Sequence, residues 1–157
     1  MANTAKTIAP HPPTDKTIKT SRFGEISIDC DKIITFTSPF LGFPNDRSFV
    51  LLPHSPKSPF FWLQSTDSPT LAFVVIQPHV IMNNYAPQLP AAIEEELKNS
   101  VEKLELMVVL TIPPGKPREM TANLLGPVVY NTEKRLAKQV ILDPNKYDPC
   151  WPVPLGA

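Results

Sequence analysis

The chain has only two cysteines and five glycines, and no hydrophobic run approaches the ~18 residues of a membrane span. Cys30 lies in an alternating strand pattern and Cys150 lies among prolines. Two isolated cysteines form neither a disulfide framework nor a zinc site, so we expect free thiols in a reducing compartment. The first residues also lack the hydrophobic core of a secretion signal. These absences predict a cytoplasmic protein that makes no use of a membrane.

An excess of charge of one sign is also absent. Fifteen basic and fifteen acidic residues give a formal net charge of zero. Proteins that hold nucleic acid through its phosphates usually present a basic face. The one dense basic cluster in the sequence consists of Lys134, Arg135 and Lys138. The sequence therefore disfavours direct nucleic-acid binding and leaves an RNA-binding barrel as a minor alternative.

Motifs for catalysis or metal binding are missing from the sequence. His11, His54 and His79 lie in unlike contexts without a ligand partner at metal spacing. No GxSxG nucleophile elbow and no GxxxxGK phosphate loop occurs. We therefore expect a protein that is not an enzyme, holds no metal or cofactor, and works by binding.

What the chain does have is proline, twenty residues of it. Proline cannot donate to a β-ladder, so it belongs at strand ends, edges and loops. The runs between the prolines are rich in strand-forming residues, and in FGEISIDC the residues Ile26, Ile28 and Cys30 alternate with polar ones. This pattern predicts a mainly β fold, a small antiparallel β-barrel-like domain of about eight strands with one short helix.

Two hairpins organise the predicted sheet. The central one pairs residues 121–130 with 135–142 through a polar turn, and Gly126 with Pro127 marks a bend in its first strand. We assign Asn123 and Asn131 to turn and backbone hydrogen bonds. A second hairpin is predicted to pair residues 60–65 with 71–77, with Trp62 in the core.

The one predicted helix covers residues 87–100. Ile93 and Leu97 are spaced for one helix face, and acidic residues near the helix start suit its dipole. These acidic residues are Glu94, Glu95 and Glu96. They form either a solvated face, which we favour, or a contact with a basic partner.

The two ends of the chain and one loop are the segments outside this strand pattern. Residues 1–19 are expected to be a disordered leader, and residues 149–157 a proline-rich tail that does not join a ladder. Trp151 in this tail either docks on its own barrel, which we favour, or binds another protein. The loop after residue 36 carries three large apolar side chains, which either fold back onto the core, the favoured reading, or face a partner. They are Phe40, Leu41 and Phe43.

Three blocks of the sequence resemble the signature blocks of the bacterial flagellar assembly factor family, FliW. They are ITFTSPFLGFP at 34–44, SPFFWLQSTDSPTLAFVVIQP at 58–78 and TANLLGPVVYNTEKRLAKQVIL at 121–142. The family usually reads FPxGxxGF in the first block, where this chain has Thr37 for the proline and Pro39 for the first glycine. The resemblance implies a FliW-like β-barrel domain over residues 20–148.

The resemblance also implies a function. Members of this family bind the translational regulator CsrA beside its RNA site and relieve its repression of flagellin messenger RNA, and flagellin competes for the same factor. Phe40, Leu41 and Phe43 are then candidate partner-binding residues. Glu94, Glu95 and Glu96 would repel phosphates near the regulator. A flagellin chaperone without a translational role is the alternative within this class.

Overall fold

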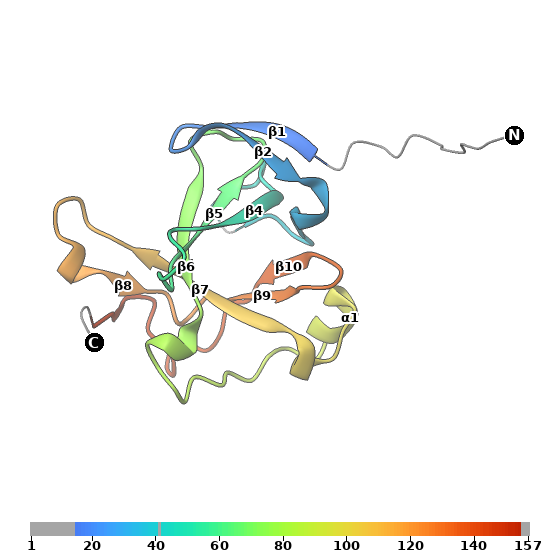
Figure 1. The fold of residues 1–157 in the computed structure, drawn as a ribbon. Coiled ribbons are helices and arrows are strands. Elements are labelled where there is room, and N and C mark those ends of the chain that lie inside the picture. The colour runs from blue at the N-terminus through green and yellow to red at the C-terminus, as the bar shows by residue number, and fades with distance from the viewer. Residues whose placement is uncertain (1–14, 41, 155–157) are drawn as a thin grey trace, which may run out of the picture.

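The computed structural model describes residues 15–40 and 42–154 (Figure 1). Positions 1–14, Leu41 and 155–157 lie outside the described residues, and with them most of the expected leader. The described strands are β1 Asp15–Thr20, β2 Gly24–Asp29, β3 Ile34–Phe36, β4 Ser48–Pro53, β5 Phe61–Ser65, β6 Ala72–Ile76, β7 Glu105–Thr111, β8 Thr121–Ala122, β9 Val128–Asn131, β10 Leu136–Gln139 and β11 Trp151–Pro152. The helices are α1 Ile93–Leu97 and the short 3-10 helices η1 Cys30–Lys32, η2 Pro78–Val80, η3 Val101–Lys103 and η4 Pro117–Glu119.

A closed barrel of seven strands forms the centre of the molecule. The strands follow the order β7, β6, β5, β4, β3, β10 and β9, and the pairing of β9 with β7 closes the ring. This confirms the mainly β, antiparallel barrel-like fold, in which the pairing of β3 with β10 is the one parallel pair of the barrel. Strand direction cannot alternate around a ring with an odd number of members. One parallel pair is therefore required.

Large side chains from most of these strands fill the barrel interior. The fully buried ones include Phe36 on β3, Phe49 on β4 and Leu63 on β5. The rings of Phe36 and Phe49 meet edge to face with their centroids 5.2 Å apart. Burying an aromatic or leucine side chain contributes roughly 1.5–3 kcal/mol, so this cluster accounts for much of the fold's stability.

The β1–β2 hairpin covers the outer face of β4, at the top of Figure 1. Ile18 and Ile28 pack there on Val50 in a second cluster. The prediction of a disordered leader is thus wrong for residues 15–19, which belong to β1. Little in the sequence indicates this strand, because Ile18 is the one apolar residue among its polar ones. Trp62 was expected in the core but is half-buried on the outside, with the Arg22 guanidinium 3.9 Å from its ring centroid.

The C-terminal segment also joins the sheet. Trp151 and Pro152 of β11 pair with β8, and Val153 beyond them is buried. A proline is tolerated here because β11 is an edge strand. The expectation that this tail stays out of any ladder is therefore wrong. The backbone of Trp151 is fixed on its own sheet, while the residue as a whole stays 38% exposed.

The predicted central hairpin is present as β9 and β10, but its first strand is interrupted. The Asn123 Oδ1 accepts from the amides of Leu125 and Gly126, which turns the backbone between β8 and β9. The Asn131 Oδ1 accepts in the same way from the two turn amides after it, and its Nδ2 donates to the Leu97 carbonyl at 2.8 Å. Both asparagines thus have the predicted turn role. Asn131 also holds α1.

We predict that Asn131→Ala lowers the free energy of unfolding by about 2–4 kcal/mol, because it removes two turn bonds and leaves the buried Leu97 carbonyl without its donor. Asn123→Ala is the matched control: it removes a similar pair of turn bonds and no bond to a helix, and should cost about 1–2 kcal/mol. Urea unfolding of both variants measures the difference. Equal losses would contradict the anchoring role of Asn131.

Candidate functional site

The loop between β3 and β4 places its apolar residues in different environments. Phe40 is only 4% exposed and stacks on Phe73 with ring centroids 4.5 Å apart, which confirms the favoured prediction that it folds back onto the core. Phe43 packs edge-on against the same ring at 5.2 Å but stays 36% exposed. Its amide donates to the Phe40 carbonyl at 2.8 Å. Of the described candidates in this loop, Phe43 is the one that offers a surface.

Polar contacts fix the end of this loop against the barrel. The Arg47 guanidinium donates to the carbonyls of Phe36 and Thr37, which tie the two ends of the loop together. The buried Asp46 carboxylate accepts from the Ser65 hydroxyl at 2.8 Å. The loop is therefore anchored even though Thr37 and Pro39 depart from the family pattern. None of these anchors was singled out from the sequence, because their partners lie far away along the chain.

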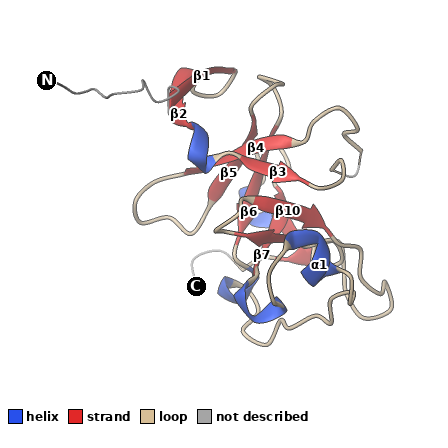
Figure 2. Ribbon diagram, turned by 90° about the vertical axis from the view of Figure 1, so that its right-hand side faces the viewer, coloured by secondary structure: helices blue, strands red, loops and turns tan. Residues whose placement is uncertain are grey.

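The helix α1 is shorter than predicted. Pro87 and Pro90 lack amide donors, and residues 85–90 form no helix. Lys98 with φ +60° ends the helix after five residues. Ile93 and Leu97 are buried against β9 and β10, as Figure 2 shows by the position of α1 on the barrel. With the bond from Asn131 to the end of the helix, this contact holds α1 in one position on the hairpin.

The three glutamates of α1 have three different roles. The Glu94 carboxylate accepts from the Val101 amide at 2.7 Å and so holds the following turn. Glu96 pairs with the Lys138 ammonium at 2.7 Å, at a site where both side chains are about one third exposed. Glu95 is exposed and forms no hydrogen bond or ion pair with the described residues. Of the three, Glu95 is the carboxylate left available to a partner.

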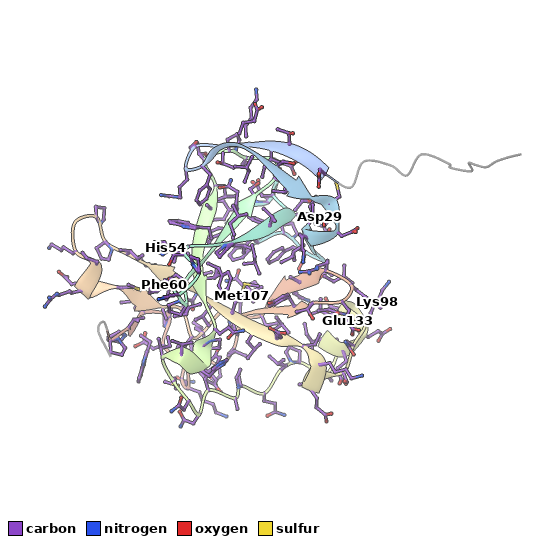
Figure 3. The ribbon with its side chains drawn as sticks, in the orientation of Figure 1. Asp29, His54, Phe60, Lys98, Met107 and Glu133 are labelled. Carbon is purple, nitrogen blue, oxygen red and sulfur yellow. The ribbon has the colours of Figure 1, made fainter. Side chains whose placement is uncertain are left out.

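A further carboxylate lies beside α1 at the tip of the β9–β10 hairpin. The Asn99 Nδ2 donates to Glu133 at 3.2 Å, and Figure 3 shows Glu133 and Lys98 next to each other there. We call Glu94, Glu95 and Glu133 the acidic helix surface. Phe43 lies in another part of the barrel. Its neighbours Phe40 and Phe73 belong to the cluster in the barrel interior, whereas α1 packs on a different hydrophobic cluster. The structure therefore divides the candidate residues between two surfaces.

The pairing of Lys138 was not predicted, although its strand carries a signal for it. Lys138 lies opposite Val129, which is buried under α1, so both side chains face the helix. Once α1 is known to pack on β9 and β10, strand alternation places the Lys138 side chain on the face of β10 that meets the helix. This pairing also divides the basic cluster seen in the sequence, because Lys138 is neutralised by Glu96.

Metal-ligating side chains do not gather in residues 15–40 and 42–154. No group of three or more His, Cys, Asp or Glu residues in this part of the chain could hold a metal ion. Burial, and then the nearby Glu105, raise the pKa of Tyr130 to about 12, and burial raises that of Tyr85 as well, so both phenols are neutral. No helix in the same residues has the length and apolar character that crossing a lipid bilayer requires.

Comparisons with known proteins agree on one family. The model of the family described as FliW protein matches residues 16–153. The flagellar assembly factor FliW of Magnetococcus marinus is 39% identical over 141 residues, which cover 87% of this chain and 83% of that protein. That of Bacillus subtilis is 38% identical over 138 residues, 87% and 95% of the two chains. A crystal structure of the flagellar assembly factor FliW has a TM-score of 0.78 and 36% identity, covering 87% of this chain and 96% of that chain.

We predict that Phe40→Ala lowers the free energy of unfolding by about 3–5 kcal/mol, because it leaves a cavity beside Phe73 in the barrel core. Phe43→Ala should cost about 1 kcal/mol, since that ring already meets solvent. Thermal or urea unfolding of the two variants separates the roles. A loss for Phe43→Ala as large as that for Phe40→Ala would show that Phe43 is a core residue.

Proposed function

Because the chain belongs to the FliW family of flagellar assembly factors, we propose that it is a cytoplasmic, non-enzymatic protein that binds CsrA and flagellin in competition. The observation that carries this proposal is the family match, which runs from residue 16 to residue 153 and so includes all seven strands of the barrel. The relatives are named assembly factors. Binding to CsrA relieves its repression of flagellin messenger RNA, and flagellin withdraws the factor from CsrA.

The acidic helix surface gives this antagonism a physical basis. A protein of zero net charge has no general attraction for RNA, and carboxylates held beside an RNA site raise the free energy of placing phosphates there. The effect requires carboxylates that stay in place. Packing of Ile93 and Leu97, together with the Asn131 and Lys138 contacts, keeps α1 fixed on the barrel. Glu95 is the exposed charge that this arrangement leaves to act on a bound polyanion.

The first test is direct binding. We expect a stoichiometric complex with purified CsrA by calorimetry, a second one with purified flagellin, and displacement of CsrA by added flagellin. Adding the protein to CsrA bound to flagellin messenger RNA should release the RNA in a gel-shift assay. Flagellin binding without RNA release would instead indicate the chaperone function. Absence of both complexes would refute the proposal.

The second test isolates Glu95. Glu95→Lys should keep CsrA binding but weaken RNA release about two- to fivefold at low salt, because exposed charges interact by about 0.2–1 kcal/mol and are screened by ions. Glu25→Lys makes the same charge change on the exposed face of β2 and should behave as the wild type. Glu94 and Glu96 are unsuitable for this test, since their substitution also removes structural contacts. Unchanged RNA release by Glu95→Lys would exclude its electrostatic role.

A further inference from the structure

One edge of the barrel wall is left without a strand partner. β4 pairs with β5 from Phe49 as far as Pro53, but its other neighbour, β3, reaches only to Phe49. The chain before β3 turns away from the wall into η1 and forms no ladder with β4. The second half of β4 therefore has a free edge among the described residues.

Hydrogen bonds at the two ends of the β4–β5 ladder show which backbone groups face this edge. The Thr66 amide donates to the Ser48 carbonyl at 3.0 Å, and the His54 amide to the Phe60 carbonyl at 3.1 Å. Bonded pairs alternate in an antiparallel ladder, so Val50 and Leu52 also bond to β5. The amide and carbonyl of Leu51 between them point to the free side. An incoming strand would meet one donor and one acceptor there.

A hollow of about 380 Å³ runs along this edge. Ile28 and Asp29 of β2 form one wall, and Leu51 and Leu52 of β4 form the other. β2 pairs with β1 on one side and has no strand partner on the side that faces the hollow. Figure 3 shows Asp29 at the end of β2, above the β9–β10 turn. We call this hollow the edge slot.

The charges at the edge slot favour an acidic occupant. Lys32 and Arg135 line it, and neither forms an ion pair with a described residue. Arg135 is held there by its backbone, whose amide donates to Asn131 and whose carbonyl accepts from Thr35, both at 2.8 Å. The one carboxylate of the slot, Asp29, already accepts from the Asp31 amide at the start of η1. The slot therefore combines an apolar wall with two cations and one carboxylate, so its lining carries a formal net charge of +1.

We propose that the edge slot binds an extended segment of a protein partner in which apolar and acidic residues alternate, and that this segment adds to β4 as a further strand. Its backbone pairs with Leu51, its apolar side chains contact Ile28 and Leu52, and its carboxylates meet Lys32 and Arg135. Strand addition to a free sheet edge derives affinity from main-chain bonds and specificity from side-chain pockets. This site shares no residue with the acidic helix surface, although the β9–β10 hairpin supports both.

The test uses the full-length chain labelled with nitrogen-15 and two capped peptides, one alternating glutamate with valine and one alternating lysine with valine. We expect the glutamate peptide to shift the amide resonances of Leu51 and Leu52 and to bind at least tenfold more tightly than the lysine peptide. Lys32→Ala combined with Arg135→Asn should weaken its binding about three- to tenfold, asparagine being chosen because Arg135 has φ +56°. Lys134→Asn, next to the slot but not lining it, should leave the dissociation constant unchanged.

Four results would overturn the proposal. Equal affinity for the two peptides, or shifts outside the slot, would show that the slot does not select an acidic strand. Shifts of the slot resonances by a single-stranded RNA oligonucleotide, without any by the glutamate peptide, would identify a nucleic-acid contact. Shifts that appear on raising the protein concentration alone, with none on adding peptide, would identify a second copy of the chain as the occupant. The peptide comparison requires no substitution, so a variant that fails to fold cannot obscure it.

Discussion

Closure of the barrel with an odd number of strands is the constraint on which the rest of the structure depends. Seven strands cannot alternate in direction around a ring, so one pair must be parallel, and here it is β3 with β10. β10 reaches this position as the second strand of a hairpin whose first strand, β9, pairs back to β7. The β9–β10 hairpin is thus the closing element of the barrel. It also carries residues that position the acidic helix surface and the edge slot.

The hairpin supplies contacts in two directions. Towards the helix, Asn131 holds the end of α1 and Lys138 pairs with Glu96. Towards the edge slot, the Arg135 carbonyl accepts from Thr35 in β3, so its side chain stands beside the free edge of β4. The slot exists because β3 is only three residues long and leaves half of β4 uncovered. A short strand next to the parallel seam therefore creates the opening.

Much of the barrel could be predicted because its signals are local. Prolines delimit the strands, and the asparagines that shape the hairpin bond to amides only two or three residues away. β1 and β11 could not be predicted, since a single buried isoleucine or a proline-rich pair gives no clear strand pattern. The pairing of Glu96 with Lys138 spans 42 positions and required the position of the helix. The prediction put Trp62 in the core because strand alternation does not distinguish the interior face of a barrel strand from an outer face that is also covered. Here the outer face is covered by Arg22.

The shared hairpin affects how binding sites can be located on this protein. Any substitution that loosens Asn131 disturbs both α1 and Arg135. The Asn131 side chain donates to the Leu97 carbonyl at the end of α1, and the Asn131 carbonyl accepts from the Arg135 amide. Loss of a partner after such a substitution would therefore not say which surface was used. Glu95 and Lys32 are exposed and form no hydrogen bond or ion pair with described residues, so changing them alters charge and leaves the hairpin intact. Substitutions at these two positions can therefore assign a partner to one surface or the other.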